Sequence, residues 1–101
     1  MTNRQTNIIE TFKNISRTLN IDMPMVHFNP KSSSSMAGIY QPAMGEITLF
    51  FGHHEIRTAL HEFAHHAHYE MDFDSYCKEQ SHGKSFNYYC EMVWKIYNQA
   101  N

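Results

Sequence analysis

The sequence of residues 54–71, HEIRTALHEFAHHAHYEM, predicts the helix around which the rest of the fold is built. Its apolar residues recur every three or four positions, which is typical of a helix that buries one face. At about 100° per residue, they lie within roughly 50° of one direction. We predict that this direction is the core face of the helix and that it consists of Ile56, Leu60, Phe63, Ala64, Ala67 and Met71.

Within this helix, His61-Glu62-Phe63-Ala64-His65 has the spacing of a zinc-binding motif. Two histidines four residues apart lie one helical turn above each other and point the same way, so both imidazoles can bind one metal ion. The pair lies roughly 100–140° from the core direction, on the shoulder of the buried face, where a metal site would border an open cleft. Glu62 lies further round, faces that cleft and is placed to act as a general base.

A catalytic zinc site needs a third protein ligand and an open position for water. We predict that this ligand is His82, because a chain reversal within residues 72–81 would return it to the first pair if the flanking helices run antiparallel. His82 could instead only cap the last helix. Three other ligands stay open from the sequence alone: the carboxylates of Glu79 and Glu91, and the thiolate of Cys77, which would indicate a closed structural site.

Other polar residues near the motif are weaker candidates for metal binding or catalysis. His54 and His68 share the histidine shoulder, but each lies about two turns from one member of the pair, so neither easily binds the same ion. We expect His66 and His68 to coat the helix surface or to contact a group that orients a ligand. Asp72 or Asp74 could be such a group. Candidate donors to a developing oxyanion are Tyr69, Tyr88 and Tyr89, although aromatic residues at helical spacing are usually core.

Outside the central helix, the chain shows the pattern of a small α+β domain. Residues 3–20 have apolar residues at helical spacing, and residues 42–45 (PAMG) form a hairpin turn between two strands. The polar residues 72–81 predict a loop. The predicted elements are a helix, three strands and two helices at residues 3–20, 25–29, 37–41, 46–51, 54–71 and 83–97. We therefore predict one α+β domain over residues 1–101, with its last two helices packed as a hairpin.

Composition and charge limit the classes of function that we expect for this chain. The net charge is −2 and no run of lysine or arginine occurs, so we expect no nucleic-acid binding by this chain alone. No apolar stretch approaches the length of a membrane span, and the polar N-terminus does not resemble a signal peptide. Cys77 and Cys90 form no CxxC pair and are expected to be reduced thiols. These features together predict a cytoplasmic protein.

The HExxH helix, followed after a loop by His-Gly-x-x-Phe at the start of a second helix, resembles the SprT-like (Spartan-type) zinc metallopeptidases. The resemblance covers roughly residues 37–98, and the matching residues are His61, Glu62, His65, His82, Gly83 and Phe86. It implies a minimal zincin-like fold, one zinc ion per chain bound by the three histidines, and Glu62 as the general base. The sequence shows neither the Cys-rich zinc ribbon nor the basic segments of the DNA-repair members. The resemblance therefore supports proteolysis in general rather than cleavage of DNA–protein crosslinks.

The predicted function is zinc-dependent hydrolysis of peptide bonds in a protein or peptide substrate. Zinc would lower the pKa of its bound water from about 15.7 towards roughly 7, and Glu62 would accept the water proton and pass it to the leaving amine. The alternative is a zinc-binding interaction or regulatory module without turnover. The glutamate beside the two histidines favours the enzyme, because a purely structural site needs no base.

Residues 46–51, EITLFF, lead into the metal-binding helix and are a candidate for binding the substrate. If this strand lies at a sheet edge, an extended peptide could pair with its backbone and place a carbonyl near the metal. If it lies between two other strands, it is an ordinary member of the sheet. The sequence pattern is compatible with both arrangements.

Overall fold

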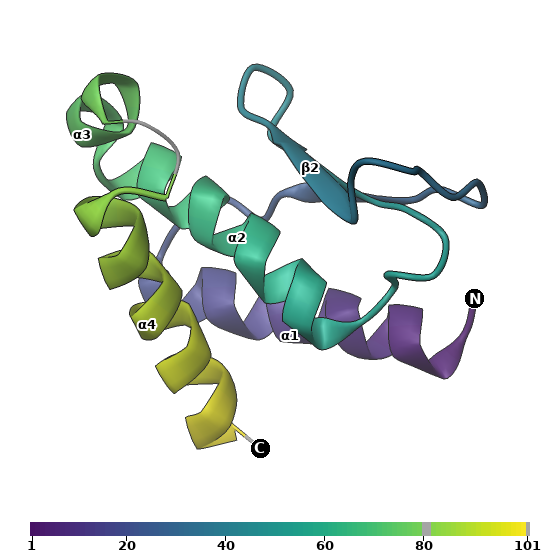
Figure 1. The fold of residues 1–101 in the computed structure, drawn as a ribbon. Helices are drawn as coiled ribbons and strands as arrows, with labels where there is room; N and C mark the ends of the chain where they lie inside the picture. Colours follow the sequence, from purple (N-terminus) through teal and green to yellow (C-terminus); the bar gives the residue numbers. More distant parts are fainter. Residues whose placement is uncertain (80–81, 101) are drawn as a thin grey trace.

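The computed structural model describes residues 1–79 and 82–100. In these residues the chain forms four α-helices and one three-stranded sheet: α1 (Asn3–Leu19), β1 (Met25–Phe28), β2 (Gly38–Gln41), β3 (Glu46–Leu49), α2 (Ile56–Met71), α3 (Phe73–Lys78) and α4 (Lys84–Ala100). Figure 1 shows α2 in the middle, with the sheet on one side, α4 on another and α1 along a third. The predicted α+β class is thereby confirmed. None of these helices is both long and apolar enough to cross a membrane.

Helix α1 begins at a capping box. The Thr2 hydroxyl accepts the N–H of Gln5 at 3.1 Å, and the Gln5 side chain accepts the Thr2 N–H at 3.1 Å. Each side chain thus satisfies a backbone donor that the helix leaves open. The apolar face of α1 is buried, and the ring of Phe12 lies 4.9 Å from that of Phe63 on α2. The amphipathic helix predicted at residues 3–20 is therefore present and packs on the central helix.

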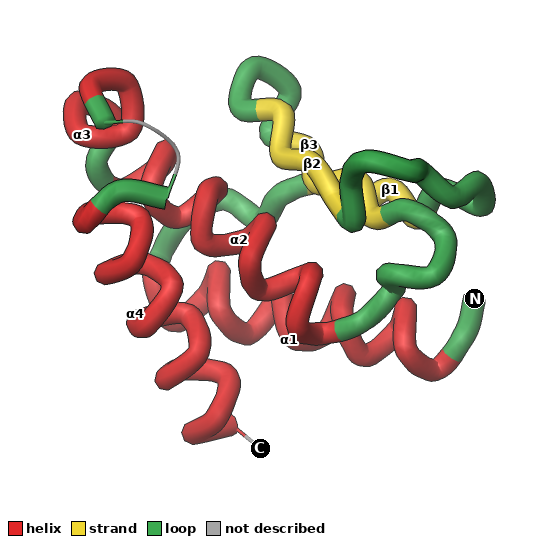
Figure 2. The backbone as a smooth tube through the Cα atoms, viewed as in Figure 1, coloured by secondary structure: helices red, strands yellow, loops and turns green. Residues whose placement is uncertain are grey.

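The sheet has the order β1-β3-β2, with β1 parallel and β2 antiparallel to β3. The predicted hairpin joins β2 to β3, and Gly45 adopts the positive φ of 61° that this turn requires. Strand β3 is central, so the suggestion that residues 46–51 form a sheet edge for substrate is wrong. The reason is long-range: β1 pairs with the free side of β3 through a crossover that no local pattern reports. The strand order makes β2 an edge strand, and β2 contacts α2; Figure 2 shows the sheet beside this helix.

Helix α2 is buried on more than its apolar stripe. Leu60, Phe63, Ala64 and Ala67 are completely buried, as predicted, whereas Met71 at the end of the helix is 42% exposed. The polar residues Glu62, His66 and His68 are buried as well. This wide burial follows from the central place of α2, which contacts α1, α3, α4, β2 and β3.

The polar segment predicted as a loop contains a short helix, α3, so that prediction is wrong for residues 73–78. Asp72 starts this helix by accepting the backbone N–H of Ser75 at 3.3 Å. The ring of Tyr76 then packs 5.2 Å from that of Tyr69 on α2, which gives the polar segment an apolar anchor. After α3, helix α4 runs back along α2 and buries Phe86, Tyr89 and Val93.

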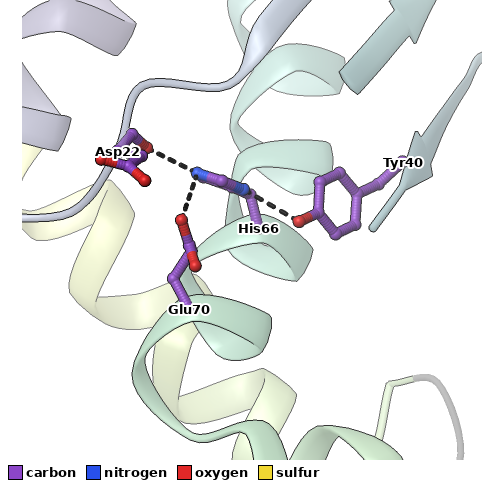
Figure 3. A network of polar contacts seen from close by, with 4 residues as sticks. All are labelled: Asp22, Tyr40, His66 and Glu70. Atoms are coloured by element: carbon purple, nitrogen blue, oxygen red, sulfur yellow. Dashed lines mark hydrogen bonds and ion pairs between the residues drawn. The ribbon is translucent and has the colours of Figure 1, made fainter. Parts of the chain in front are cut away.

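A buried hydrogen-bond network joins α2 to the sheet and to the α1–β1 connection (Figure 3). His66 Nε2 lies 2.7 Å from the carbonyl oxygen of Asp22, and His66 Nδ1 lies 2.9 Å from the hydroxyl of Tyr40 on β2. A carbonyl only accepts, so Nε2 carries the proton and Nδ1 accepts from Tyr40. Burial raises the pKa of Tyr40 above its ordinary range, which keeps the hydroxyl a donor. The expectation that His66 coats the helix surface is therefore wrong.

Candidate metal centre

The three histidines predicted as metal ligands lie together. One ring nitrogen from each of His61, His65 and His82 can be chosen so that all three atoms lie within 4.8 Å of one another. The closest pair is His61 Nε2 and His82 Nε2, at 3.1 Å. The fold thus brings residues from α2 and from the turn before α4 to one point. Among the described residues, this group is placed to hold a metal ion.

The donor set fits a transition-metal ion. Zn–N bonds of about 2.1 Å in a tetrahedron place two nitrogens about 3.4 Å apart, which is close to the His61–His82 separation. Burial, with smaller contributions from its neighbouring histidines, lowers the pKa of His65 to about 4. Burial and the nearby His82 also lower the pKa of His61. Neutral imidazole is the form that binds metal, so these two ligands are ready near neutral pH.

The ring of Phe86, in the first turn of α4, packs against all three imidazoles. It stacks on His65 with a centroid distance of 4.2 Å and lies 5.2 Å from His61 and 4.8 Å from His82. Phe86 is itself 3% exposed, so it forms a fixed apolar wall behind the ligands. Phe86 thus belongs both to the buried face of α4 and to the wall of the candidate site.

Glu62 lies beside the histidines in a cleft of about 720 Å³. Its side chain is 7% exposed, and burial raises its pKa to about 7. One wall of the cleft is α2 with His61, Glu62 and His65, and the facing wall is β2 with the residues just before it. The cleft also contains Tyr76, which the sequence did not single out, because a tyrosine in a polar segment carries no signal of its own.

In metal-free protein, ionisation of Glu62 should lower the free energy of unfolding. The pKa of Glu62 is about 7 in the fold against 4.5 for an ordinary glutamate, so only the unfolded chain loses this proton as the pH rises between those values. Stability from this group is thus present at low pH and lost as the pH rises through about 7. We expect Glu62→Gln to be about 2 kcal/mol more stable than wild type near pH 8 and nearly equal near pH 4.5, after allowing for partial solvation.

This expectation is checked by urea unfolding of metal-free wild type and Glu62→Gln across that pH range. The titrations of His61 and His65 are shared by both proteins and cancel in the difference. Glu10→Gln, at an exposed site on α1, controls for the general effect of removing one negative charge. A difference between wild type and Glu62→Gln that does not change with pH would contradict the raised pKa of Glu62.

Gly38 allows β2 to approach Glu62 closely. A Cβ atom at this position would lie 3.1 Å from Glu62 Cγ and 3.0 Å from the carbonyl oxygen of Thr48. The second contact is with sheet backbone, which cannot move aside cheaply. We expect Gly38→Val to lower the free energy of unfolding by about 1–3 kcal/mol, measured by urea unfolding. Gln41→Val, at the exposed end of the same strand, should change it far less; equal effects of the two variants would rule out this crowding.

The alternative ligands do not join the histidine group. Cys77 is exposed on α3, Glu91 is exposed on α4, and neither lines the cleft. The carboxylate of Glu79 accepts hydrogen bonds from Ser75 and from the backbone of Ser85 instead. Of the candidates weighed from the sequence, His82 is the one beside His61 and His65.

The remaining predicted residues have structural roles. His54 lies 3.0 Å from the carbonyl oxygen of Leu49, and His68 is buried and lies 2.7 Å from the hydroxyl of Ser75. Asp72 caps α3, and Asp74 is exposed in its first turn. The three tyrosines proposed as oxyanion donors do not line the cleft: Tyr69, Tyr88 and Tyr89. The tyrosines that do line it are Tyr40 and Tyr76.

Fold and site together define a small α+β domain with a three-histidine candidate metal centre beside a buried glutamate. No protein-family model, no curated protein and no solved structure matches this chain.

Proposed function

We propose that this chain is a zinc-dependent metallopeptidase with a minimal zincin-like fold, similar to the SprT-like enzymes. The observation that carries the proposal is the position of Glu62, whose buried carboxyl group shares one cleft with three converging imidazoles. A closed structural metal site needs no carboxyl group in an open cleft beside its ligands, whereas a hydrolase uses such a group as a base. Zinc is the proposed ion because three imidazoles and an open position are its usual hydrolytic set.

The residues divide the chemistry between them. His61, His65 and His82 would hold the ion, and bound zinc would supply a water with a pKa lowered from about 15.7 towards roughly 7. Glu62 would accept a proton from that water and return it to the leaving nitrogen, because its carboxyl group lies in the same cleft as the three imidazoles.

The substrate is an extended peptide segment that adds to β2. This strand pairs with β3 on one side only, and residues 38–40 line the cleft opposite the histidines. Backbone hydrogen bonds along the free side of β2 would hold a peptide in extended form across the site. The net charge of −2 and the absence of basic runs favour a polypeptide over a nucleic acid as the ligand.

The proposal is tested with purified chain, zinc and an unfolded, reduced substrate protein, with fragments identified by mass spectrometry. We expect cleavage that a chelator stops and that added zinc restores. Metal-free chain supplemented with magnesium is the matched control, because three imidazoles hold magnesium poorly. Binding of zinc without cleavage of any unfolded substrate would instead identify a zinc-binding interaction module.

A further inference from the structure

His82 has an unusual backbone conformation. It lies two residues before α4 with a φ of 69°, in the left-handed region that residues other than glycine rarely adopt. Such a conformation costs about 1–3 kcal/mol and persists only where the surroundings hold it. The ring of His82 packs 4.8 Å from that of Phe86, but the residue stays exposed, so this contact covers only part of it. Further contacts restrain the backbone on both sides of His82.

A directed chain of hydrogen bonds reaches this turn from the buried side of α2. Ser75 donates its hydroxyl proton to Glu79 Oε2 at 2.5 Å, so its oxygen is free to accept from His68 Nε2 at 2.7 Å. His68 is 4% exposed and its ring stacks on Tyr89 of α4 at 5.1 Å, so the chain starts from a fixed point. The orientation of the Glu79 carboxylate is thereby determined by α2 and α3.

The second carboxylate oxygen of Glu79 contacts the first turn of α4. Glu79 Oε1 accepts the backbone N–H of Ser85, in the first turn of α4, at 3.4 Å. A carboxylate in this position satisfies a free N–H group at the start of the helix and interacts favourably with its dipole. Hydrogen bonds from Ser75 and Ser85 lower the pKa of Glu79, which keeps the carboxylate charged. Both oxygens are thus occupied, on either side of the turn that contains His82.

We propose that Glu79 is a positioning residue for the metal site: its carboxylate links the end of α3 to the first turn of α4 and so holds His82 towards His61 and His65. The inference rests on the proposed metal-binding function of the three histidines. Glu79 itself does not belong to the histidine group. Its role is to limit the conformations that His82 adopts before the ion binds, so that less ordering is needed on binding.

The test compares Glu79→Ala and Glu79→Gln with wild type. Zinc affinity is measured by competition with a chromogenic chelator, and the ligand set is read from the visible spectrum of the cobalt(II) form at saturation. We expect Glu79→Ala to bind zinc roughly 10–100-fold more weakly, with cobalt bands at unchanged positions. Glu79→Gln keeps one acceptor oxygen and should lie between wild type and Glu79→Ala. Glu91→Ala removes an exposed carboxylate from α4 and should stay within about two-fold of wild type.

The contact between Glu79 and the Ser85 amide is also tested in metal-free protein. Amide hydrogen exchange at Ser85 should quicken in metal-free Glu79→Ala but not in Glu91→Ala, with the helical amide of Asn87 as the internal reference. Unchanged zinc affinity and unchanged Ser85 exchange in Glu79→Ala would overturn the inference. So would a changed cobalt spectrum, because it would make Glu79 a ligand. If the wild type binds no zinc but its Ser85 amide is protected from exchange, the proposed metal-binding function is wrong, although the contact between Glu79 and Ser85 exists.

Discussion

His65→Ala is expected to abolish zinc binding at stoichiometric metal. His65 is the ligand held most firmly, because it comes from the central helix and stacks on Phe86. Loss of one direct ligand should cost more than the roughly 10–100-fold typical of residues that only orient ligands. Zinc at a thousand times its dissociation constant stabilises the fold by about 4 kcal/mol, which raises the Tm of a domain of this size by more than about 10 °C. His65→Ala should lose this increase.

The measurement combines zinc content by elemental analysis with thermal unfolding, each with and without added zinc. His61→Ala and His82→Ala should behave like His65→Ala, because the three nitrogens form one group. The control is His27→Ala, which removes an exposed histidine from β1 and should keep both the zinc and the thermal shift. If His82→Ala retained full zinc affinity, the third ligand would lie elsewhere.

Glu62→Gln is expected to lower peptide hydrolysis by roughly 10²–10⁴-fold without loss of zinc. Glutamine has nearly the shape of glutamate, so it can occupy the tight space beside Gly38. Its amide cannot take a proton from water, and for this reason the chemical step should fail while the three histidines keep their places. The rate is measured as fragment formation at equal zinc occupancy, confirmed by elemental analysis of both proteins.

Glu55→Gln is the matched control for this experiment. Glu55 also lines the cleft and is the N-cap residue of the same helix; its carboxylate accepts the Thr58 hydroxyl at 3.4 Å but no backbone N–H of that helix. We expect its rate to stay within about three-fold of wild type, as for a surface substitution. Equal rates for wild type and Glu62→Gln would show that another group takes the proton, and would remove Glu62 from the role of base.

Much of the fold could be predicted because its signals are local. The periodicity of α1, α2 and α4 and the turn residues between β2 and β3 depend on neighbours within a few positions. The polar residues 72–81 predicted a loop, but the Asp72 cap and the contact of Tyr76 with Tyr69 form α3 at residues 73–78. The sequence left open whether residues 46–51 lie at a sheet edge, and a distant strand, β1, makes β3 central. His66 is buried because Tyr40 and the carbonyl group of Asp22 come from elsewhere in the chain.

For the candidate site, helical periodicity is enough to predict that His61 and His65 share one face with Glu62 beside them, since helix geometry repeats every 3.6 residues whatever surrounds it. Which of the later candidates joins that pair depends on contacts between distant parts of the chain. His82 reaches the pair because α4 packs back along α2, with Phe86 against all three rings, while Glu79 is drawn into hydrogen bonds with Ser75 and Ser85. The physical reason is that packing between distant segments, unlike helical periodicity, depends on the fit of whole surfaces.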